Sequence, residues 1–274
     1  MRVDSHHHLW AISRGDYGWL TPDLAEIYRD FTMDDLDPLL DAAGIDRTVV
    51  VQAAATVAET EFLLETAAGA DRIAGVVGWI DMEAPDALVT LDRLALHPKF
   101  RGIRPMIQDI ADDEWLLRAS LDPVFEALVE RGLTFDALVL PRHLGPLLAR
   151  ARRHPGLRFV IDHGAKPALA TGEIEAWKKD IARIAAETAC FCKLSGLLTE
   201  AGDAPTLDRI RPAAEHLLAC FGPDRLMFGS DWPVLNLASD YARWAGMVET
   251  LLADLPAAEA ARVRGDTARR FYGL

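Results

Sequence analysis

Cysteine is scarce in this chain of 274 residues, which contains only Cys190, Cys192 and Cys220. An odd number without a dense framework excludes a disulfide-stapled fold and fits reduced thiols in the cytoplasm. Cys190 and Cys192 stand too close together for a standard bridge. We expect them to pack as buried apolar side chains, with a C-x-C metal or redox pair as the alternative.

Long apolar runs and excess positive charge are also missing. No run approaches the roughly 20 apolar residues that span a bilayer, and the start MRVDSHHHLW has no secretory leader. The formal net charge of −13 argues against binding of nucleic acid or of an anionic membrane surface, since both need basic residues. We therefore expect a cytoplasmic monomer or homo-oligomer whose partner is a small molecule.

Three familiar catalytic motifs are absent. The chain has no Gly-rich phosphate loop, no G-x-S-x-G elbow and no four-cysteine zinc pattern. This excludes the usual signs of nucleotide binding and of serine-nucleophile chemistry.

What the chain does contain is an alternation of two kinds of segment. Short β-branched or apolar runs alternate with segments of helical periodicity, which implies parallel strands joined by helical crossovers. The runs are 2–8, 48–53, 73–80, 101–107, 133–138, 158–162, 190–195 and 225–230. Eight such units in this length predict one (β/α)8 barrel domain over residues 1–274, with an open doubly wound sheet as the alternative.

The longest irregular stretch, residues 11–30, follows the first strand. It contains Tyr17, Trp19 and Tyr28 and comes directly after Trp10. Its aromatic content favours an ordered wall or lid over the barrel mouth rather than a disordered loop.

The first strand ends in histidines. In a strand, residues two apart share a face, so His6 and His8 point the same way and His7 faces away, as a surface or supporting residue. Two imidazoles on a rigid strand can hold one metal ion. The alternative, a tag remnant, is disfavoured because the histidines continue an apolar strand.

The sixth strand ends in Asp162 and His163. We expect His163 to share the inward face with Phe159 and Ile161, and Asp162 to face the helices as a structural residue. Because active sites of these barrels lie at the C-terminal ends of strands, His163 is a site candidate, although a strand-end histidine can be purely structural.

Asp231 follows the eighth strand. At this rim a carboxylate can bind a metal, take a proton from water, or do both. Its alternative role is to cap the next helix.

Two cations lie near the ends of the fourth and seventh strands, Arg104 and Lys193. Lys193 shares a face with Phe191 and Ser195, opposite Cys190 and Cys192. A charge inside a barrel rim is costly without a partner, so each residue predicts either an oxygen-rich substrate or an internal salt bridge.

With these residues in view, the chain resembles the amidohydrolase superfamily, and within it the branch of sugar lactonases (fucono- and rhamnonolactonases) and pyrone-dicarboxylate lactonases. The segments that carry the resemblance run from one end to the other: DSHHHLW at 4–10, DYGWLTPDL at 16–24, FRGIRP at 100–105, VIDHGAKP at 160–167, CKLSGL at 192–197, RLMFGSDWPV at 225–234 and ARRFYGL at 268–274.

The resemblance implies a distorted barrel with a site at four residues, His6, His8, His163 and Asp231. It further implies one divalent ion on these four residues, zinc above all, which in some lactonases of this branch is weakly bound or absent. Contacts to substrate would come from Arg104, Lys193, Trp19 and Trp232. The bridging lysine of two-metal members is missing, because the fourth strand offers Arg104 and Met106 instead.

These features together predict a lactone hydrolase that opens a sugar-derived aldonolactone. Asp231 would deprotonate a water held near His6 and His8, and a divalent ion, or His163 with Lys193, would stabilise the oxyanion. Two alternatives are a metal-dependent decarboxylase, for which only His143 could supply the extra histidine, and a non-catalytic ligand-binding barrel.

Overall fold

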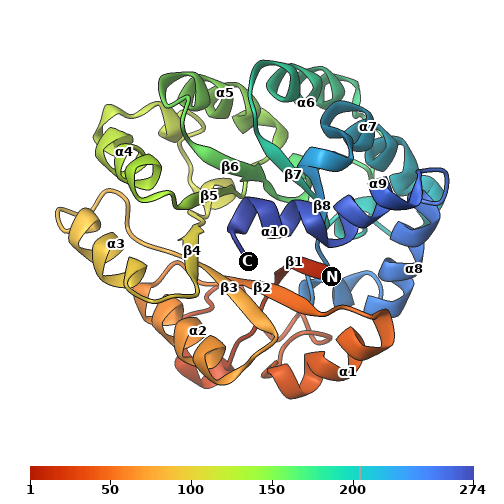
Figure 1. Cartoon of the computed structure of the whole chain (residues 1–274), viewed down its shortest axis with the longest axis horizontal. Helices are drawn as coiled ribbons and strands as arrows, with labels where there is room; N and C mark the ends of the chain where they lie inside the picture. Colours follow the sequence, from red (N-terminus) through yellow and green to blue (C-terminus); the bar gives the residue numbers. More distant parts are fainter. Residues whose placement is uncertain (204) are drawn as a thin grey trace.

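The computed structural model describes residues 1–203 and 205–274, and these residues form an eight-stranded parallel sheet. The strands pair in sequence order from β1 to β8, and the helices lie around the outside of the sheet (Figure 1). Sequential order with each step parallel is the arrangement of a (β/α)8 barrel. The predicted barrel is confirmed, and the open doubly wound sheet is wrong because that fold reverses its strand order.

The eight strands are β1 Val3–His7, β2 Arg47–Val51, β3 Ile73–Gly78, β4 Phe100–Ile103, β5 Thr134–Ala137, β6 Arg158–Ile161, β7 Phe191–Leu194 and β8 Leu226–Phe228. The helices of the described chain are α1 Met33–Ala43, α2 Val57–Gly69, α3 Ala87–Ala95, α4 Asp122–Arg131, α5 Leu144–Arg153, α6 Glu175–Glu187, α7 Leu207–Arg225, α8 Tyr241–Leu251, α9 Ala257–Ala261 and α10 Thr267–Tyr272. Each predicted apolar run contains or overlaps one of these strands.

The barrel closes through the segment just beyond β8. The backbone N–H of His8 donates to the carbonyl of Trp232 at 2.7 Å, and that of Asp231 donates to the carbonyl of His6 at 2.8 Å. The seam between the first and last strands therefore fixes His6, His8 and Asp231 relative to one another.

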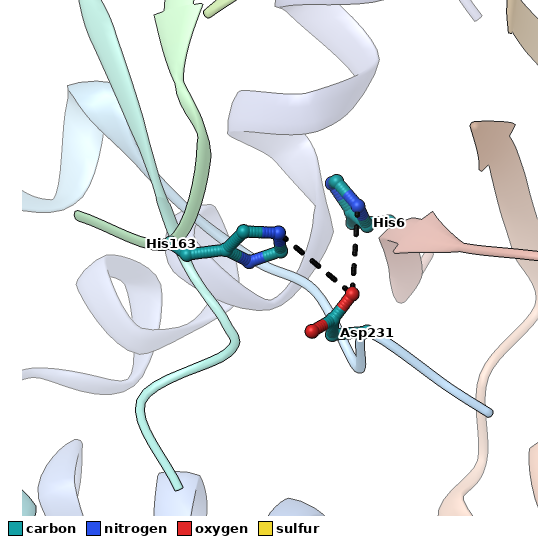
Figure 2. Close-up of side chains that lie close together, drawn as sticks. All are labelled: His6, His163 and Asp231. Carbon is teal, nitrogen blue, oxygen red and sulfur yellow. Dashed lines mark ion pairs between the residues drawn. The ribbon is translucent and has the colours of Figure 1, made fainter. Parts of the chain in front are cut away.

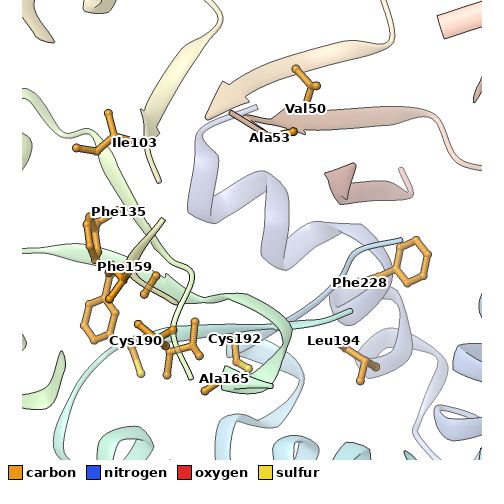
Figure 3. Close-up of a cluster of buried hydrophobic side chains, with 14 of the residues drawn as sticks. Val50, Ala53, Ile103, Phe135, Phe159, Ala165, Cys190, Cys192, Leu194 and Phe228 are labelled. Atoms are coloured by element: carbon orange, nitrogen blue, oxygen red, sulfur yellow. The ribbon is translucent and has the colours of Figure 1, made fainter. Parts of the chain in front are cut away.

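Two apolar layers follow from the alternation of side chains along each strand. One set faces the helices and includes Val50, Ile103, Phe135, Phe159 and Leu194 (Figure 3). A smaller set, with Val49, Val51, Val77, Val160 and Met227, packs inside the barrel against Ala268, Phe271 and Tyr272. The last three belong to α10, which lies across one end of the barrel beside the N-terminus (Figure 1).

The long segment after β1 is ordered, as predicted. It begins with a short helix at Ile12–Arg14, and Tyr17, Leu20 and Ile27 are buried in the core. Trp10 and Phe31 form an antiparallel bridge across its base, with Trp10 N–H to Phe31 carbonyl at 3.1 Å. The segment therefore forms a packed wall rather than a loose loop.

The cysteines carry free thiols. Cys190 and Cys192 are buried in the layer that faces the helices (Figure 3), and Cys220 is half-buried. The prediction of apolar packing is confirmed.

Within the part of the chain that the structure describes, no helix combines the length and the apolar character that crossing a bilayer requires.

Candidate active site

Three histidines turn one nitrogen each toward a single carboxylate oxygen, Oδ1 of Asp231. The distances are 3.2 Å from Nε2 of His8, 3.7 Å from Nε2 of His6 and 3.7 Å from Nε2 of His163. Figure 2 shows His6, on β1, and His163, in the turn after β6, both aimed at Asp231. The four predicted residues, far apart in the sequence, therefore converge at one point.

The other ring nitrogen of each histidine is engaged by the protein. Nδ1 of His8 lies 2.7 Å from the carbonyl of Val51, and Nδ1 of His163 lies 2.8 Å from Oγ of Ser195. A carbonyl can only accept, so Nδ1 of His8 carries the hydrogen and the neutral ring presents a lone pair to Asp231. A proton or a cation shared between this lone pair and the carboxylate would stabilise the contact.

A left-handed turn delivers His163 to the site. The φ angles are +54° at His163, +57° at Gly164, +62° at Ala165 and +50° at Lys166. Asp231 also has a positive φ of +59°. Such conformations cost about 1 kcal/mol or more in non-glycine residues and concentrate at functional sites.

Because of this turn, the side chains of β6 point to faces opposite to those predicted from the sequence. Phe159 and Ile161 lie in the layer that faces the helices, whereas Val160 packs inside the barrel. Asp162 continues the inward set and is fully buried beside Lys193, so its prediction as a helix-facing residue is wrong. His163 still reaches the pocket because the left-handed backbone breaks the alternation.

Beneath the histidines lies a cluster of buried charges. Nζ of Lys193 lies 2.5 Å from Oδ2 of Asp136, 2.9 Å from Oδ1 of Asp162 and 2.9 Å from Nδ1 of His6. The hydroxyl of Tyr272 donates to Asp136 at 2.6 Å. The cluster thus connects α10 to the floor of the site.

Charge and burial shift the pKa values of this cluster in opposite directions. Burial raises the pKa of Asp136, whereas at Asp162 the ammonium of Lys193 outweighs burial and holds the pKa well below its usual range. Burial, together with Lys193, lowers the pKa of His6 well below its ordinary value. His6 is therefore neutral near pH 7.

Arg104, the residue directly after β4, completes this layer. Its Nη1 lies 3.2 Å from Nε2 of His6 and 3.4 Å from Asp162, and its Nη2 donates to the carbonyl and to Oε1 of Gln52. Both ends of the guanidinium are therefore occupied by protein groups. Asp136 and Asp162 balance the charges of Arg104 and Lys193.

Above this layer is a pocket of about 260 Å³, a size that suits a small ligand. Its wall combines the site residues with apolar and polar side chains: His8, Trp19, Leu24, Ala53, Arg104, Met106, Gln108, Asp109, Leu138, His163, Lys166, Asp231, Val234 and Leu237. Trp19 is held in this wall by a bond from its indole N–H to the carbonyl of Ala53 at 2.7 Å.

Three residues considered from the sequence lie away from this wall. Lys193 is fully buried below it. Trp232 is buried with its indole 5.1 Å from the ring of Phe31, centre to centre. His143 is buried beside α5, with Nδ1 accepting from the backbone of Leu140 at 3.1 Å. Substrate contact by Lys193 or Trp232 stays a prediction that the pocket lining does not support.

The carboxylate of Asp231 is ionised at neutral pH. Burial acts to raise its pKa, but His163 and the bond with His8 outweigh burial, so the pKa lies below the usual range. Burial lowers the pKa of His163 to about 4. Near pH 7 the pocket therefore holds an anionic carboxylate among neutral imidazoles, as a general base needs.

A second carboxylate, Asp4, holds the backbone of the site. Its Oδ1 accepts from the N–H of His6 at 3.1 Å and of Ser230 at 2.8 Å, and its Oδ2 accepts from the hydroxyl of Tyr241 at 2.9 Å. The sequence reasoning missed this residue, although a carboxylate two positions before the first histidine was a visible signal.

The donor set fits a small divalent ion. Ligand atoms of His6, His163 and Asp231 lie within 4.8 Å of one another, and two imidazoles with a carboxylate are a set that zinc favours. The guanidinium of Arg104 lies beside Nε2 of His6, the nitrogen that would bind the ion. This neighbouring positive charge would weaken the binding of a cation.

Comparison with known proteins decides the family. The amidohydrolase family model matches residues 3–274. The chain belongs to the amidohydrolase family.

This amidohydrolase has close relatives with assigned names. It is 47% identical to L-fucono-1,5-lactonase of Burkholderia ambifaria and 39% identical to the protein of the same name from Burkholderia multivorans, in each case over 100% of this chain and 96% of the relative. A crystal structure of an amidohydrolase from Burkholderia multivorans with bound zinc superposes with a TM-score of 0.94 at 38% identity, covering 100% of this chain and 99% of the other.

Proposed function

We propose that this amidohydrolase hydrolyses a sugar-derived aldonolactone and that residues 1–274 act as one catalytic domain. The observation that carries the proposal is the convergence of His6, His8 and His163 on the ionised carboxylate of Asp231, which lines a small pocket. Similarity along the full length to two L-fucono-1,5-lactonases supports a lactone, and a fuconolactone in particular, as the substrate.

In this mechanism Asp231 takes a proton from a water molecule. The water oxygen bonds to the lactone carbonyl carbon, and the carbonyl electrons move onto oxygen. The tetrahedral intermediate then collapses, the bond from carbon to ring oxygen breaks, and the ring oxygen takes the proton back from Asp231. The hydroxy acid formed loses its proton to solvent, so the net change is the addition of one water.

The remaining groups orient the reaction. Nε2 of His8 lies 3.2 Å from Oδ1 of Asp231, within reach of a shared proton or cation, and Ser195 fixes the ring of His163. Trp19 lines the pocket and, we propose, contacts the sugar hydroxyls. The predicted substrate contact from Arg104 gains no support from the geometry, because both of its terminal nitrogens already bond to protein atoms. The predicted oxyanion contact from Lys193 gains no support from the geometry, because its ammonium already contacts Asp136, Asp162 and His6.

A divalent ion, zinc first, would be held by His6, His163 and Asp231. When bound it would act as a Lewis acid and lower the pKa of water. We propose weak binding, because the guanidinium of Arg104 lies close by.

The test is a pH-indicator screen of aldonolactones, run with and without chelator and combined with metal analysis of the purified protein. We expect acid release from L-fuconolactone that survives chelation at least in part. Carbon dioxide release, without acid release from any lactone, would replace this proposal with the decarboxylase alternative. Ligand binding with no turnover of any kind would favour the non-catalytic barrel.

A further inference from the structure

We propose that Lys166 is the substrate-facing cation of this site and that its ammonium binds the carbonyl oxygen of the lactone, then the carboxylate of the product. This inference rests on the proposed lactone hydrolysis. It gives Lys166 the contact that sequence reasoning gave to Lys193.

The first support is that the other two cations of the site, Lys193 and Arg104, are already bonded to protein groups. Lys193 is buried among Asp136, Asp162 and His6, and both terminal nitrogens of Arg104 bond to protein atoms. Lys166 also lines the pocket, yet its ammonium forms no ion pair within 4.0 Å among residues 1–203 and 205–274. A half-buried ammonium without a fixed carboxylate is free to meet an oxygen of the ligand.

The second support is the route by which the backbone reaches this position. Lys166 lies one left-handed turn after His163, and its N–H donates to the carbonyl of His163 at 2.9 Å. The turn holds three non-glycine residues at positive φ, with +54° at His163 and +50° at Lys166 at its two ends. A strained segment whose first and last side chains both line one pocket indicates that the pocket requires both.

The third support is the charge that the reaction creates. A lactone is neutral, whereas its transition state and product carry negative charge on the former carbonyl oxygen. Asp231 is protonated while the oxyanion exists and supplies no positive charge to it, and once ionised again it repels the product carboxylate. The buried cluster below is already balanced. Lys166 supplies a positive charge at the pocket wall, and a cation beside the developing negative charge stabilises the transition state.

Glu200 is a carboxylate on which the charge of Lys166 acts. It is half-buried in the turn at Thr199–Ala201, and its pKa is raised by burial while Lys166 acts to lower it. The two side chains are near enough to interact, but they form no ion pair within 4.0 Å among the described residues. Glu200 therefore leaves the ammonium available to the ligand.

The test compares Lys166→Met and Lys166→Arg with the wild type, using L-fuconolactone as substrate and L-fuconate as product inhibitor. We expect Lys166→Met to lower kcat/KM about 100-fold and to weaken inhibition by L-fuconate at least about 10-fold, because one stabilising charge is lost. Lys166→Arg should recover much of both. Lys179→Met, which removes an exposed lysine from α6, is the matched control and should behave as wild type.

The outcomes separate the two proposals. If the wild type hydrolyses L-fuconolactone but Lys166→Met keeps wild-type kcat/KM and inhibition by L-fuconate, the role of Lys166 is overturned and the lactonase proposal stands. If the wild type hydrolyses no lactone, the proposed function is wrong, and the role of Lys166, which depends on it, is wrong as well. The thermal unfolding midpoints of the Lys166 variants are measured as well. Midpoints near that of the wild type show that lost activity reflects the missing charge rather than unfolding.

Discussion

At the scale of single residues, the chemistry depends on the ionised carboxylate of Asp231. Asp231→Asn removes the proton acceptor while keeping nearly the same shape. We expect kcat to fall by about 10²–10⁴-fold, the usual contribution of a general base, with little change in KM. Steady-state hydrolysis of L-fuconolactone measures both constants.

Asp109→Asn is the matched control for this prediction. Asp109 also lines the pocket, but it is exposed and lies outside the group of histidines. Near wild-type turnover in Asp231→Asn would contradict the general-base assignment, whatever the control shows.

Lys193 illustrates a charge whose role is structural support rather than contact with a ligand. Lys193→Met leaves the carboxylates of Asp136 and Asp162 buried without their main cation. Removal of one partner of a buried ion pair costs about 3–5 kcal/mol. We expect urea unfolding to show a loss of this order.

A double variant tests whether the unpaired carboxylates are the cause of this loss of stability. Adding Asp136→Asn to Lys193→Met removes one uncompensated carboxylate and should restore part of the lost stability. If the double variant is as unstable as the single one, repulsion between unpaired carboxylates is not the cause.

At the scale of elements, the sequence predicted the strands well because their signal is local. Runs of β-branched and apolar residues appear at β1 to β8, and helical segments separate them. The order of pairing then follows from the rules for parallel crossovers. The histidines and Asp231 were found because each stands at the end of such a run.

The inward face of β6 could not be predicted, because it depends on backbone conformation beyond the strand. Strict alternation with His163 on the inner face put Asp162 outside, and the left-handed turn that begins at His163 reverses that assignment. A lone carboxylate such as Asp136 gave no signal, since its partners Lys193 and Tyr272 are distant in sequence. Lys166 lay within a recognised motif but had no visible partner.

The turns that surround His163 also require a glycine. A Cβ added at Gly196 would lie 2.5 Å from Nδ1 of His163, and Gly196 has a φ of +61°. We expect Gly196→Ala to displace the imidazole, lower kcat at least about 10-fold and destabilise the protein by about 1–3 kcal/mol.

Gly172→Ala separates backbone strain from displacement of the ring. Gly172 has a φ of +78°, but a Cβ there would meet nothing within 4 Å. This variant should lose stability and keep its activity. Equal loss of kcat in both alanine variants would show that contact with His163 is not the reason for the glycine.

At the scale of the whole molecule, the free energy of unfolding should depend on pH through a histidine outside the site chemistry. His7, predicted as a surface or supporting residue, is fully buried, so the surface alternative is wrong. Neither of its ring nitrogens has a hydrogen-bond partner among the described residues. Burial, reinforced by His8, lowers the pKa of His7 from 6.5 to about 3. As pH falls from 6.5 toward 3, the unfolded chain binds a proton that the folded chain does not, so stability is complete above pH 6.5 and decreases below it.

His7→Leu should remove this part of the pH dependence. By linkage, the His7 contribution amounts to about 2 kcal/mol between pH 7.5 and pH 5. Glu59 acts in the opposite sense, since burial raises its pKa to about 7 and its contribution is lost as pH rises through that value. Because Glu59 and His163 titrate in both proteins, the difference between the wild-type and His7→Leu curves isolates His7. Urea unfolding at pH 7.5 and pH 5 measures that difference, and parallel curves would mean that His7 is protonated in the folded protein or finds a partner there.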